Sequence, residues 1–382
     1  MPIQRLIGSA PGPGMLRSRT VAIGAVLAIV SACAGSELET PLNLPPGQGH
    51  WRLDPNSPII RAGDFLDKAL WNDPSVLRTA DGYVMYMTSS TKEPFKPPVL
   101  PFRAVSKDGV KWRLQPNTPL MDVSGTPFVS IETPSVVFYK NEYHMYFSGI
   151  HPSGKIPMME IGHATSADGI RWRKDPKPVI TSSGKVREWT GFLVGEPGAI
   201  VYNDKIYVYF TAMGERPGGS PPQLQNIGLA TSSDGRTFDS PRIALSQSKL
   251  YPPERGFPGY STPSALVDGK TVHLFYDVVH FLKNAKPEWR QVALQHAVSH
   301  DGGLRFVEDR GPILRREDTS WARTGEVIGP AAIIDGNAVK LWFGSHAGYD
   351  ELGNMIRRGW KGPEFGIGMV STSLSQLRDP KN

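Results

Sequence analysis

Cysteine is almost absent from this chain, because Cys33 is the only one in 382 residues. A single cysteine excludes an intrachain disulfide, so the fold cannot depend on the cystine framework typical of small secreted domains. The apolar stretch near the start, residues 21–30, is too short to remain a stable membrane span. Long helical periodicity is also missing between the aromatic-rich segments. These absences argue against a disulfide-stapled, membrane-spanning or mainly helical protein.

Charge of one sign is not concentrated in the sequence. The chain has 42 Lys and Arg against 36 Asp and Glu, a net charge of +6. No cluster of Lys and Arg is interleaved with aromatic residues, which argues against nucleic acid as a partner. Gly and Pro are numerous, at 40 and 35, and aromatics are spread between them, which favours a turn-rich all-β fold over disorder.

What the chain does contain is one pattern written five times. Each copy has a proline after a small residue or a carboxylate, then a short apolar strand, a turn and an aromatic-rich strand. The prolines, spaced by 60, 63, 66 and 67 residues, are Pro74, Pro134, Pro197, Pro263 and Pro330. Repeats of this length indicate a propeller or an array of small sheets. We therefore expect an all-β, five-bladed β-propeller with the residues beside these prolines in a ring.

Two kinds of turn complete the pattern. Pairs such as Asp81-Gly82 and Asp268-Gly269 join the first two strands, as expected for tight hairpins that need positive φ. Four copies continue with Ala-x-Ser-x-Asp-Gly and a later aromatic, starting at Ala104, Ala164, Ala230 and Ala297. We expect this element to be a structural turn whose aromatic packs between neighbouring blades. A sugar or calcium site at its aspartate is the alternative.

The fifth copy ends without that turn sequence. Residues 50–55, His-Trp-Arg-Leu-Asp-Pro, resemble residues 111–116, Lys-Trp-Arg-Leu-Gln-Pro. We therefore predict that an N-terminal strand closes the last blade, which removes an open sheet edge. Residues 50–382 would then form one propeller domain.

Residues 1–33 are predicted to be a targeting segment. A basic start and a short apolar core precede Val-Ser-Ala-Cys, which resembles a bacterial lipobox with Cys33 as the lipidated residue. Residues 34–49 would be a tether. This predicts a lipid-anchored protein of the bacterial cell envelope, in the outer membrane or at the cell surface. Simple cleavage and secretion is the alternative.

Carboxylates and histidines gather where the first strand of each blade begins and the second ends. These points lie on one face of the ring, so we expect one central pocket. Its candidate catalytic residues are Asp73, Glu132 and Glu196, with Asp64 and Asp67 as alternative acids. The residues expected to contact a ligand there are Trp71, Asn72, Thr133, His151, Thr262, Asp277, His280 and His346.

These motifs resemble the five-bladed propeller glycosidases, namely glycoside hydrolase families 43 and 32 of the arabinanase, levansucrase and invertase type. Trp71-Asn72-Asp73-Pro74 is similar to the first-blade motif of the invertase-like family, whose Asp is the nucleophile. In the family 43 pattern, the first-blade Asp is the general base. Gly195-Glu196-Pro197 is similar to the site of the general acid. The resemblance implies cleavage of an oligo- or polysaccharide, with Trp71 as a platform for a sugar face.

The second blade departs from the family pattern, which places an Asp before the proline as a stabiliser or a modulator of the acid's pKa. This chain has Glu132-Thr133-Pro134. Since successive strand residues alternate faces, a carboxylate moved by one residue need not keep its role. Three functions stay open: hydrolysis, phosphorolysis as in the related family 130, and glycan binding without turnover. Arg357, Arg358 and Lys361 could contribute to a phosphate site.

Acid–base cleavage by two carboxylates requires no cofactor. The resemblance suggests a structural calcium in the channel near His346, but no dense ligand motif supports a metal site. A glycan and, through the lipid, the membrane are the expected partners of a monomer. Specificity would come from loops 89–101, 213–225 and 346–364, which carry no readable code.

Overall fold

The computed structural model describes residues 42–67, 69–90, 97–214, 224–281, 289–322, 325–346 and 366–378. Within these ranges the chain is almost wholly β-structure, as predicted. Its helical elements there are one α-helix, α1 (Leu374–Arg378), and two short 3-10 turns, η1 (Pro253–Arg255) and η2 (Arg316–Asp318). In the described ranges, no helix has the length and apolar character needed to cross a membrane. The predicted targeting segment and the predicted lipidated residue, Cys33, lie outside the described residues.

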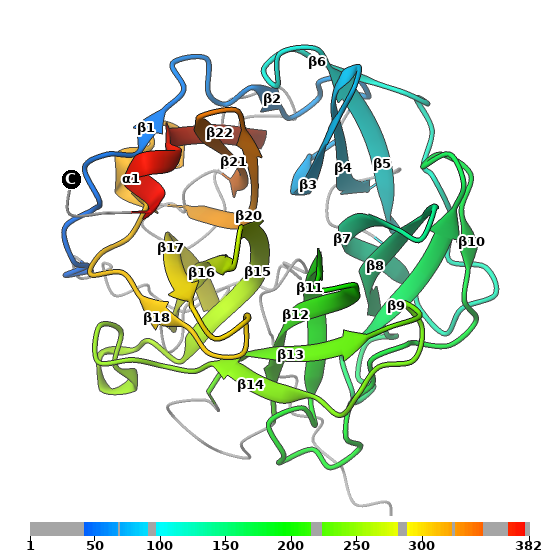
Figure 1. Cartoon of the computed structure of the whole chain (residues 1–382). Helices are drawn as coiled ribbons and strands as arrows, with labels where there is room; N and C mark the ends of the chain where they lie inside the picture. Colours follow the sequence, from blue (N-terminus) through cyan, green and yellow to red (C-terminus); the bar gives the residue numbers. More distant parts are fainter. Residues whose placement is uncertain are drawn as a thin grey trace, which may run out of the picture.

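The strands form antiparallel meanders arranged around a common axis (Figure 1). The first contains β3 (Asn72–Thr79), β4 (Gly82–Ser90), β5 (Val99–Ser106) and β6 (Trp112–Leu114). The second contains β7 (Ser130–Tyr139), β8 (Glu142–Ile150), β9 (Met159–Ser166) and β10 (Arg173–Lys174). The third contains β11 (Leu193–Tyr202), β12 (Lys205–Met213), β13 (Asn226–Ser232) and β14 (Arg242–Leu245).

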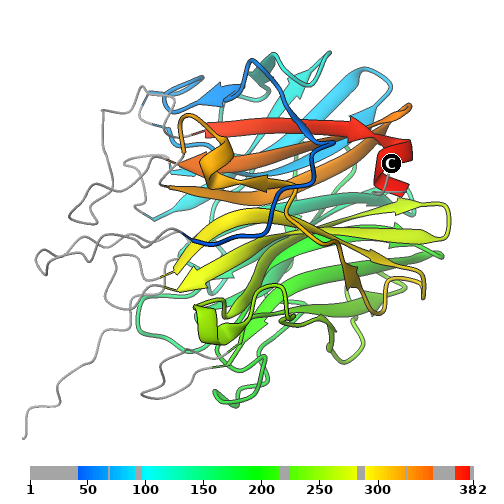
Figure 2. The ribbon, with the colours of Figure 1, turned by 90° about the vertical axis from the view of Figure 1, so that its left-hand side faces the viewer.

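The fourth and fifth meanders each carry two short outer strands. The fourth contains β15 (Gly259–Asp268), β16 (Thr271–Phe281), β17 (Trp289–Ser299), β18 (Val307–Glu308) and β19 (Leu314–Arg315). The fifth contains β20 (Glu326–Asp335), β21 (Ala338–His346) and β22 (Gly366–Ser373), with β1 (Arg52–Leu53) and β2 (Ile60–Arg61) paired to β22. Seen from the side, the long strands lie roughly parallel to the axis, and neighbouring strands point in opposite senses (Figure 2).

The N-terminal strand pairs with the last meander, as the sequence predicted. Arg52 lies opposite Ser371 in the antiparallel pair of β1 with β22. Residues 42–49, expected to be a tether, instead lie against the fourth meander, where the Gln48 amide donates to the carbonyl of Gly311 at 2.7 Å. The physical reason is burial, since Leu42 and Leu44 pack on the apolar cluster there. The packed part of the chain therefore begins before residue 50.

An edge-to-face aromatic pair joins each meander to the next. The pairs, with ring centroids 5.5–6.2 Å apart, are Tyr86–Trp172, Tyr146–Phe238, Tyr209–Phe306, Phe275–Trp51 and Trp342–Trp112. Such pairs add about 0.5–1.5 kcal/mol beyond the burial of their area. The predicted packing of the turn aromatics between neighbours is confirmed, and Trp51 takes the place of the turn aromatic that the fifth copy lacks.

The Asp-Gly elements are structural turns. In the first, the Asp108 carboxylate accepts the N–H groups of Val110 and Lys111, both at 2.8 Å, and Ser106 Oγ accepts that of Gly109. These hydrogen bonds, that of Lys111 first, lower the pKa of Asp108. Because the turn itself engages the carboxylate, the structure supports the structural interpretation of this element.

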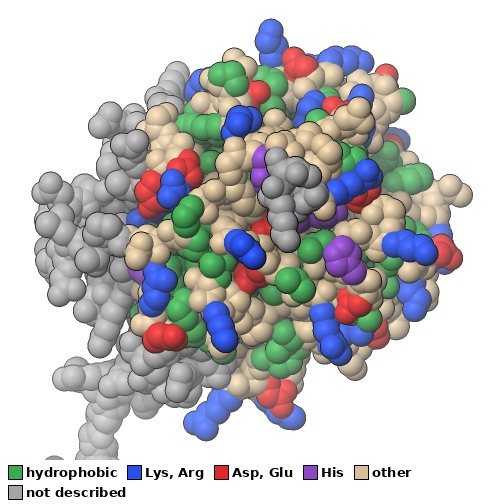
Figure 3. Space-filling model, turned by 60° about the vertical axis from the view of Figure 1, so that its left-hand side comes forward, with side chains coloured by type: hydrophobic (Ala, Val, Ile, Leu, Met, Phe, Trp, Pro, Cys, Tyr) green, Lys and Arg blue, Asp and Glu red, His purple; other side chains and the backbone are tan. Residues whose placement is uncertain are grey.

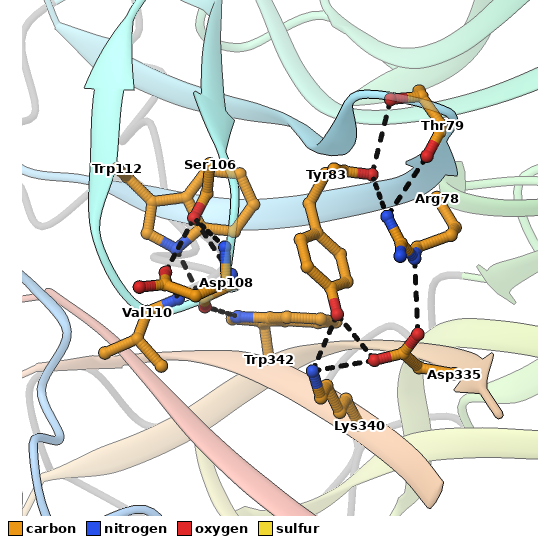
Figure 4. A network of polar contacts seen from close by, with 12 residues as sticks. Arg78, Thr79, Tyr83, Ser106, Asp108, Val110, Trp112, Asp335, Lys340 and Trp342 are labelled. Atoms are coloured by element: carbon orange, nitrogen blue, oxygen red, sulfur yellow. Dashed lines mark hydrogen bonds and ion pairs between the residues drawn. The ribbon is translucent and has the colours of Figure 1, made fainter. Parts of the chain in front are cut away.

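A polar network closes the ring between the first and fifth meanders (Figure 4). Asp335 lies 2.8 Å from Lys340 Nζ and 3.2 Å from Arg78 Nε, and it accepts the Tyr83 hydroxyl at 2.5 Å. Lys340 and then Tyr83 lower the pKa of Asp335 to about 2. Arg78 lies near the end of β3, whereas Asp73 lies at its start, so this network and the candidate site occupy opposite ends of the strand.

The surface visible in Figure 3 shows both signs of charge interspersed over the described residues. No large patch of one sign stands out among them on this face.

Trp51 provides a test of ring closure. Replacement of Trp51 by Ala is expected to lower the free energy of unfolding by about 3 kcal/mol, because the indole is buried against Phe275 and Leu314 in the core of the last junction. Urea unfolding followed by tryptophan fluorescence measures the change. Arg113→Ala is the control, because Arg113 is an exposed residue of the corresponding outer strand β6. Its free energy of unfolding should stay within about 0.5 kcal/mol of the wild-type value. A Trp51→Ala protein as stable as the control would show that β1 is dispensable.

Candidate active site

The residue before each repeated proline has a left-handed backbone conformation. The φ angles are 54° at Asp73, 49° at Thr133, 52° at Glu196, 48° at Thr262 and 62° at Gly329. In every meander the pairing of the first two strands shifts register at this point, as in a β-bulge. Such a conformation costs about 1–3 kcal/mol in a residue other than glycine. Four strained side chains at one level of the ring are typical of a functional site, where bulges redirect side chains.

Hydrogen bonds between adjacent inner strands hold this ring together. Ser75 Oγ accepts the N–H of Val136 at 3.1 Å, and Ser135 Oγ accepts that of Ala199 at 2.8 Å. At the corresponding position of the third meander, Gly198 has no side chain, because a Cβ atom there would lie 2.1 Å from the carbonyl oxygen of Pro263. The backbone of the ring is therefore fixed from one meander to the next.

The inner strands enclose a central channel of about 330 Å³. Its wall is made by residues 73–77, 133–138, 197–201, 262–267 and 329–333. In four of these segments the residue before the proline marks one end, and mostly apolar residues follow it toward the other. The third segment begins at Pro197, so Glu196 is not one of the lining residues. Figure 1 shows the inner strands β3, β7, β11, β15 and β20 around this centre.

Asp73 is 3% exposed and lies in the ring. Its Oδ2 atom accepts the hydroxyl of Thr88 at 2.5 Å. Burial raises the pKa of Asp73 to about 6, although hydrogen bonds from Thr88 and from the backbone of Thr133 oppose the shift. This carboxylate is ionised above about pH 6 and can act there as a base or a nucleophile.

Glu196 is 5% exposed and lies in the ring of the third meander. Its N–H donates to Ser148 Oγ at 2.7 Å, and its Oε2 accepts the N–H of Thr262 at 3.2 Å. Burial raises the pKa of the Glu196 carboxyl, the Thr211 hydroxyl opposes this, and the neighbouring Asp73 adds to it. A carboxyl that keeps its proton to a higher pH suits a general acid.

Glu132 does not occupy the ring position of the second meander, because Thr133 does. Glu132 lies one residue earlier, paired with Ser148 across the strands, and is 2% exposed. Burial, and then the charge of Asp73, raise its pKa well above the ordinary value. Its Oε1 atom is buried and has no hydrogen-bond partner among the described residues. The carboxyl therefore lies within electrostatic range of Asp73 and of Glu196, but from a different strand position.

Trp71, expected to be a stacking platform, lies in the core. It is 1% exposed, its ring meets the edges of Phe102 and Phe65, and its indole N–H donates to the carbonyl of Asp64 at 2.7 Å. This placement supports a packing role, because no face of the indole is presented to a ligand. Asp64 itself is engaged by the backbone of Arg61, and Asp67 is exposed, so neither joins the ring.

The remaining predicted residues lie at several depths. Thr262 is in the ring, and Asp277 is fully buried behind it, where it accepts the N–H of Gly329. Asn72 places its Oδ1 atom against Gly344, at a position that leaves no room for a side chain on that glycine.

The histidines expected in the pocket have other contacts. His151 contacts Glu160 at 3.0 Å, and His346 pairs with Glu326. His280 packs against the ring of Phe257. Among the described residues, no group of three or more His, Cys, Asp or Glu side chains is placed to hold a metal ion.

Ser148 is a site residue that the sequence analysis missed. Its hydroxyl accepts the backbone N–H of Glu196. In its meander Ser148 occupies the same position of the second strand as Thr88 and Thr211 do in theirs. Alignment of the ends of the second strands would have found it. Most of the three predicted specificity loops and the three basic residues near 360 lie outside the described residues.

The fold is an all-β arrangement of meanders around a central channel, with buried carboxylates in its inner ring. Residues 132–256 match the family described as the glycosyl hydrolases family 32 N-terminal domain. The matched segment spans the second and third meanders and includes Glu132 and Glu196, but it does not reach Asp73. No curated protein matches the chain.

Solved structures resemble this fold over most of the chain. The chain is similar to a thermostable family-43 glycoside hydrolase, with 14% identity, TM-score 0.57 and coverage of 81% of this chain and 91% of that one. It is also similar to a β-1,2-mannobiose phosphorylase from Listeria innocua, with 12% identity, TM-score 0.60 and coverage of 86% and 98%. A GH43_1 enzyme from Xanthomonas citri has 12% identity, TM-score 0.54 and coverage of 82% and 90%. The family match over residues 132–256 and these likenesses of fold agree with the resemblance drawn from the sequence.

Proposed function

We propose that the protein is a glycoside hydrolase that cleaves an oligo- or polysaccharide at the centre of a five-bladed propeller. The observation that carries this proposal is the pair of Asp73 and Glu196. Both precede a repeated proline, both have positive φ, and both are buried at the same level of the ring of inner strands. A carboxylate is expensive to bury, so two of them in one ring support a shared chemical task.

The two carboxyls divide the chemistry of glycosidic cleavage. Glu196 transfers its proton to the glycosidic oxygen as the bond to the anomeric carbon breaks, and the alcohol fragment leaves. Ionised Asp73 either removes a proton from the water that attacks the anomeric carbon, or attacks that carbon itself and is later released by water. In the second route, Glu196 takes a proton from the water and so regains its starting form.

The second meander supplies the surroundings of this pair. The backbone of Thr133 hydrogen-bonds to Asp73 and favours its ionised form, and Ser148 fixes the backbone of Glu196. Burial, and then the charge of Asp73, raise the pKa of Glu132 and so favour its neutral form. Thr133, Thr262 and the other ring residues are the proposed contacts of the sugar.

The proposal is tested by incubating the purified protein, residues 34–382, with aryl glycosides and natural α- and β-linked oligosaccharides. Release of reducing ends that is lost in Glu196→Gln would establish the hydrolase. Turnover that requires inorganic phosphate would instead support a phosphorylase, the activity named for the Listeria innocua relative. Saturable binding of one glycan with no turnover across the panel would make the propeller a receptor and would contradict the proposal.

We further propose that Cys33 anchors the protein to the bacterial envelope, on the strength of the lipobox resemblance. Metabolic labelling with a radioactive fatty acid should mark the wild-type protein, and Cys33→Ser should abolish the label. Equal labelling of the variant would contradict this anchor.

A further inference from the structure

The second meander contains a chain of buried hydrogen bonds that the candidate active site does not use. Nδ1 of His144 on β8 lies 3.0 Å from Nε2 of His163 on β9, and Nδ1 of His163 lies 2.8 Å from Oδ2 of Asp175. The two imidazoles are 3% and 0% exposed, and their centroids lie 5.2 Å apart in a stacked pair. We call this chain of two histidines and one aspartate a relay.

The fourth meander contains a second relay, built from the same atoms. Nδ1 of His273 on β16 lies 3.0 Å from Nε2 of His296 on β17, and Nδ1 of His296 lies 2.6 Å from Oδ2 of Asp309. These imidazoles are 1% and 2% exposed, and their centroids are also 5.2 Å apart.

A meander does not require a relay in order to form. His163 and His296 lie opposite the aromatic residues Tyr146 and Phe275, which pack against the next turn of the ring. The residues at this position in the other meanders are Arg103, Leu229 and Met369. Since burial of polar rings is costly, their occurrence twice with the same paired atoms indicates a purpose other than strand pairing.

The hydrogen bonds assign the protons of a relay. The bond from His163 is the first cause that lowers the pKa of Asp175, so this carboxylate is ionised and accepts the hydrogen on His163 Nδ1. Nε2 of a neutral His163 then has no proton and accepts the N–H of His144 Nδ1. The inner histidine, which is His144 here and His273 in the fourth meander, is therefore neutral.

A relay can take up one proton but not two. One added proton can lie on Nε2 of His163, which then donates to a His144 ring that is still neutral. A second proton would place an N–H on both facing nitrogens, which are 3.0 Å apart, and two cations would repel one another where little water screens them. An intact relay therefore contains at least one neutral imidazole.

Both acidic and basic groups surround the inner histidines. Burial, and then the partner histidine, lower the pKa of His144 to about 4 and that of His273 to about 3. The other groups that act on His144 are Glu142, Arg236 and Asp175. The other groups that act on His273 are Asp268, which is paired with Arg378, Asp309 and His300. The carboxylates among them favour a charged imidazole, but burial and the partner ring outweigh them.

Each relay ends at a contact with a neighbouring part of the ring. Oδ2 of Asp175 accepts the Nε–H of Arg236, from the turn after β13 in the third meander, at 3.3 Å. Oδ2 of Asp309 accepts an N–H of the Gln48 amide, from the N-terminal segment, at 3.1 Å. That segment leads to β1, whose pairing with β22 completes the last sheet.

We propose that the two relays are acid-sensitive locks of the ring, each of which breaks when both of its imidazoles become charged. In the unfolded chain, a histidine takes up a proton below its ordinary pKa of about 6.5. The inner histidine takes up its proton only after the relay has opened, so acid favours the open chain. The stabilising contribution of each lock is complete above about pH 6.5 and is lost as the pH falls toward 4. This inference does not depend on the proposed glycan chemistry.

Replacement of the inner histidines by Gln tests this proton count. The Gln amide can donate to the facing Nε2 atom or accept from it, but it cannot become charged. Urea unfolding between about pH 4.5 and pH 5.5, followed by tryptophan fluorescence, gives the unfolding equilibrium constant. His144→Gln and His273→Gln should each make the rise of this constant on acidification about tenfold per pH unit smaller than in the wild type.

His300→Gln is the matched control, because His300 is exposed and belongs to neither relay. Its unfolding constant should keep the pH dependence of the wild type. A histidine that only fills space would change the constant by the same factor at every pH. Equal pH dependence in the wild type and in both inner-histidine variants would therefore overturn the proposal.

NMR of the wild type, labelled with 15N in the histidine rings, gives an answer even where a variant does not fold. Of the nine histidines, at least two should still be neutral at about pH 5, one from each relay. Nine charged rings in the folded protein at this pH would overturn the proposal.

Hydrogen exchange locates the lock of the fourth meander. The N–H of Gln48 donates to the carbonyl of Pro312 at 2.8 Å. After correction for intrinsic rates, its protection in the wild type should fall at least about tenfold between about pH 7 and pH 5. This loss should be about tenfold smaller in His273→Gln and unchanged in His144→Gln. An equal loss in the two variants would contradict a lock at this joint.

Discussion

Replacement of Glu196 by Gln is expected to lower kcat about 10³-fold, because the amide cannot donate a proton to the leaving oxygen. The fold should be retained, since the Gln carbonyl can still accept the N–H of Thr262 and the backbone bond to Ser148 is unaffected. Initial rates on the best substrate of the glycan panel measure the effect. Glu188→Gln is the matched control, because Glu188 is an exposed residue paired with Lys185, and this variant should keep full activity.

Aryl glycosides with good leaving groups sharpen this test. Because a leaving group of low pKa needs little protonation, the loss in Glu196→Gln should be smaller for a nitrophenyl glycoside than for a natural oligosaccharide. A loss of less than tenfold on both substrates would remove Glu196 from the role of acid.

Replacement of Asp73 by Asn is expected to reduce kcat by a similar factor and to stabilise the protein at neutral pH. The pKa of Asp73 is about 6 in the folded protein and near 3.8 in the unfolded chain. Its stabilising contribution is therefore complete below about pH 4 and is lost as the pH rises through about 6. Asn does not ionise and has no such loss. The free energy of unfolding of Asp73→Asn, relative to that of the wild type, should therefore rise by about 2–3 kcal/mol between pH 4 and pH 7.5.

Urea unfolding of the wild type and of Asp73→Asn at both pH values measures this difference. Asp175→Asn is an informative comparison, because the His163 contact lowers the pKa of Asp175 and the pH trend should have the opposite sign. If Asp73→Asn were less stable than the wild type at pH 7.5, the Asp73 charge would be structural, and its assignment as base or nucleophile would fail.

Much of the fold could be predicted from the sequence, because its determinants are local. The prolines, the Asp-Gly turns and the turn aromatics each lie within a few residues of the structure they specify. The similarity of residues 50–55 to residues 111–116 was sufficient to place Trp51 at the last junction. In the predicted tether, residues 34–49, the described part from residue 42 onward is packed, because Leu42 and Leu44 find apolar partners in a meander far along the chain.

The site was harder to predict, because one residue of register decides which side chain enters the ring. In the second meander a bulge with positive φ places Thr133 at the ring position and Glu132 one residue before it. No pattern in the sequence predicts this bulge. Trp71 was assigned to the ligand because it adjoins Asp73, but strand alternation turns it onto Phe102. Asp277 was expected to contact a ligand. The structure shows instead that it accepts the backbone N–H of Gly329, a contact that the sequence does not indicate.

The pairing of β1 with β22 also constrains the order of assembly. The strand that completes the last sheet is synthesised first, and its partner is synthesised almost last. Such a contact spans nearly the whole chain, and contacts of high sequence separation are slow to form. During translation β1 must therefore stay without its partner strand while the first four meanders can already pair internally. The last sheet is completed only when residues 366–373 have left the ribosome, so the nascent chain carries an unpaired strand for most of its synthesis.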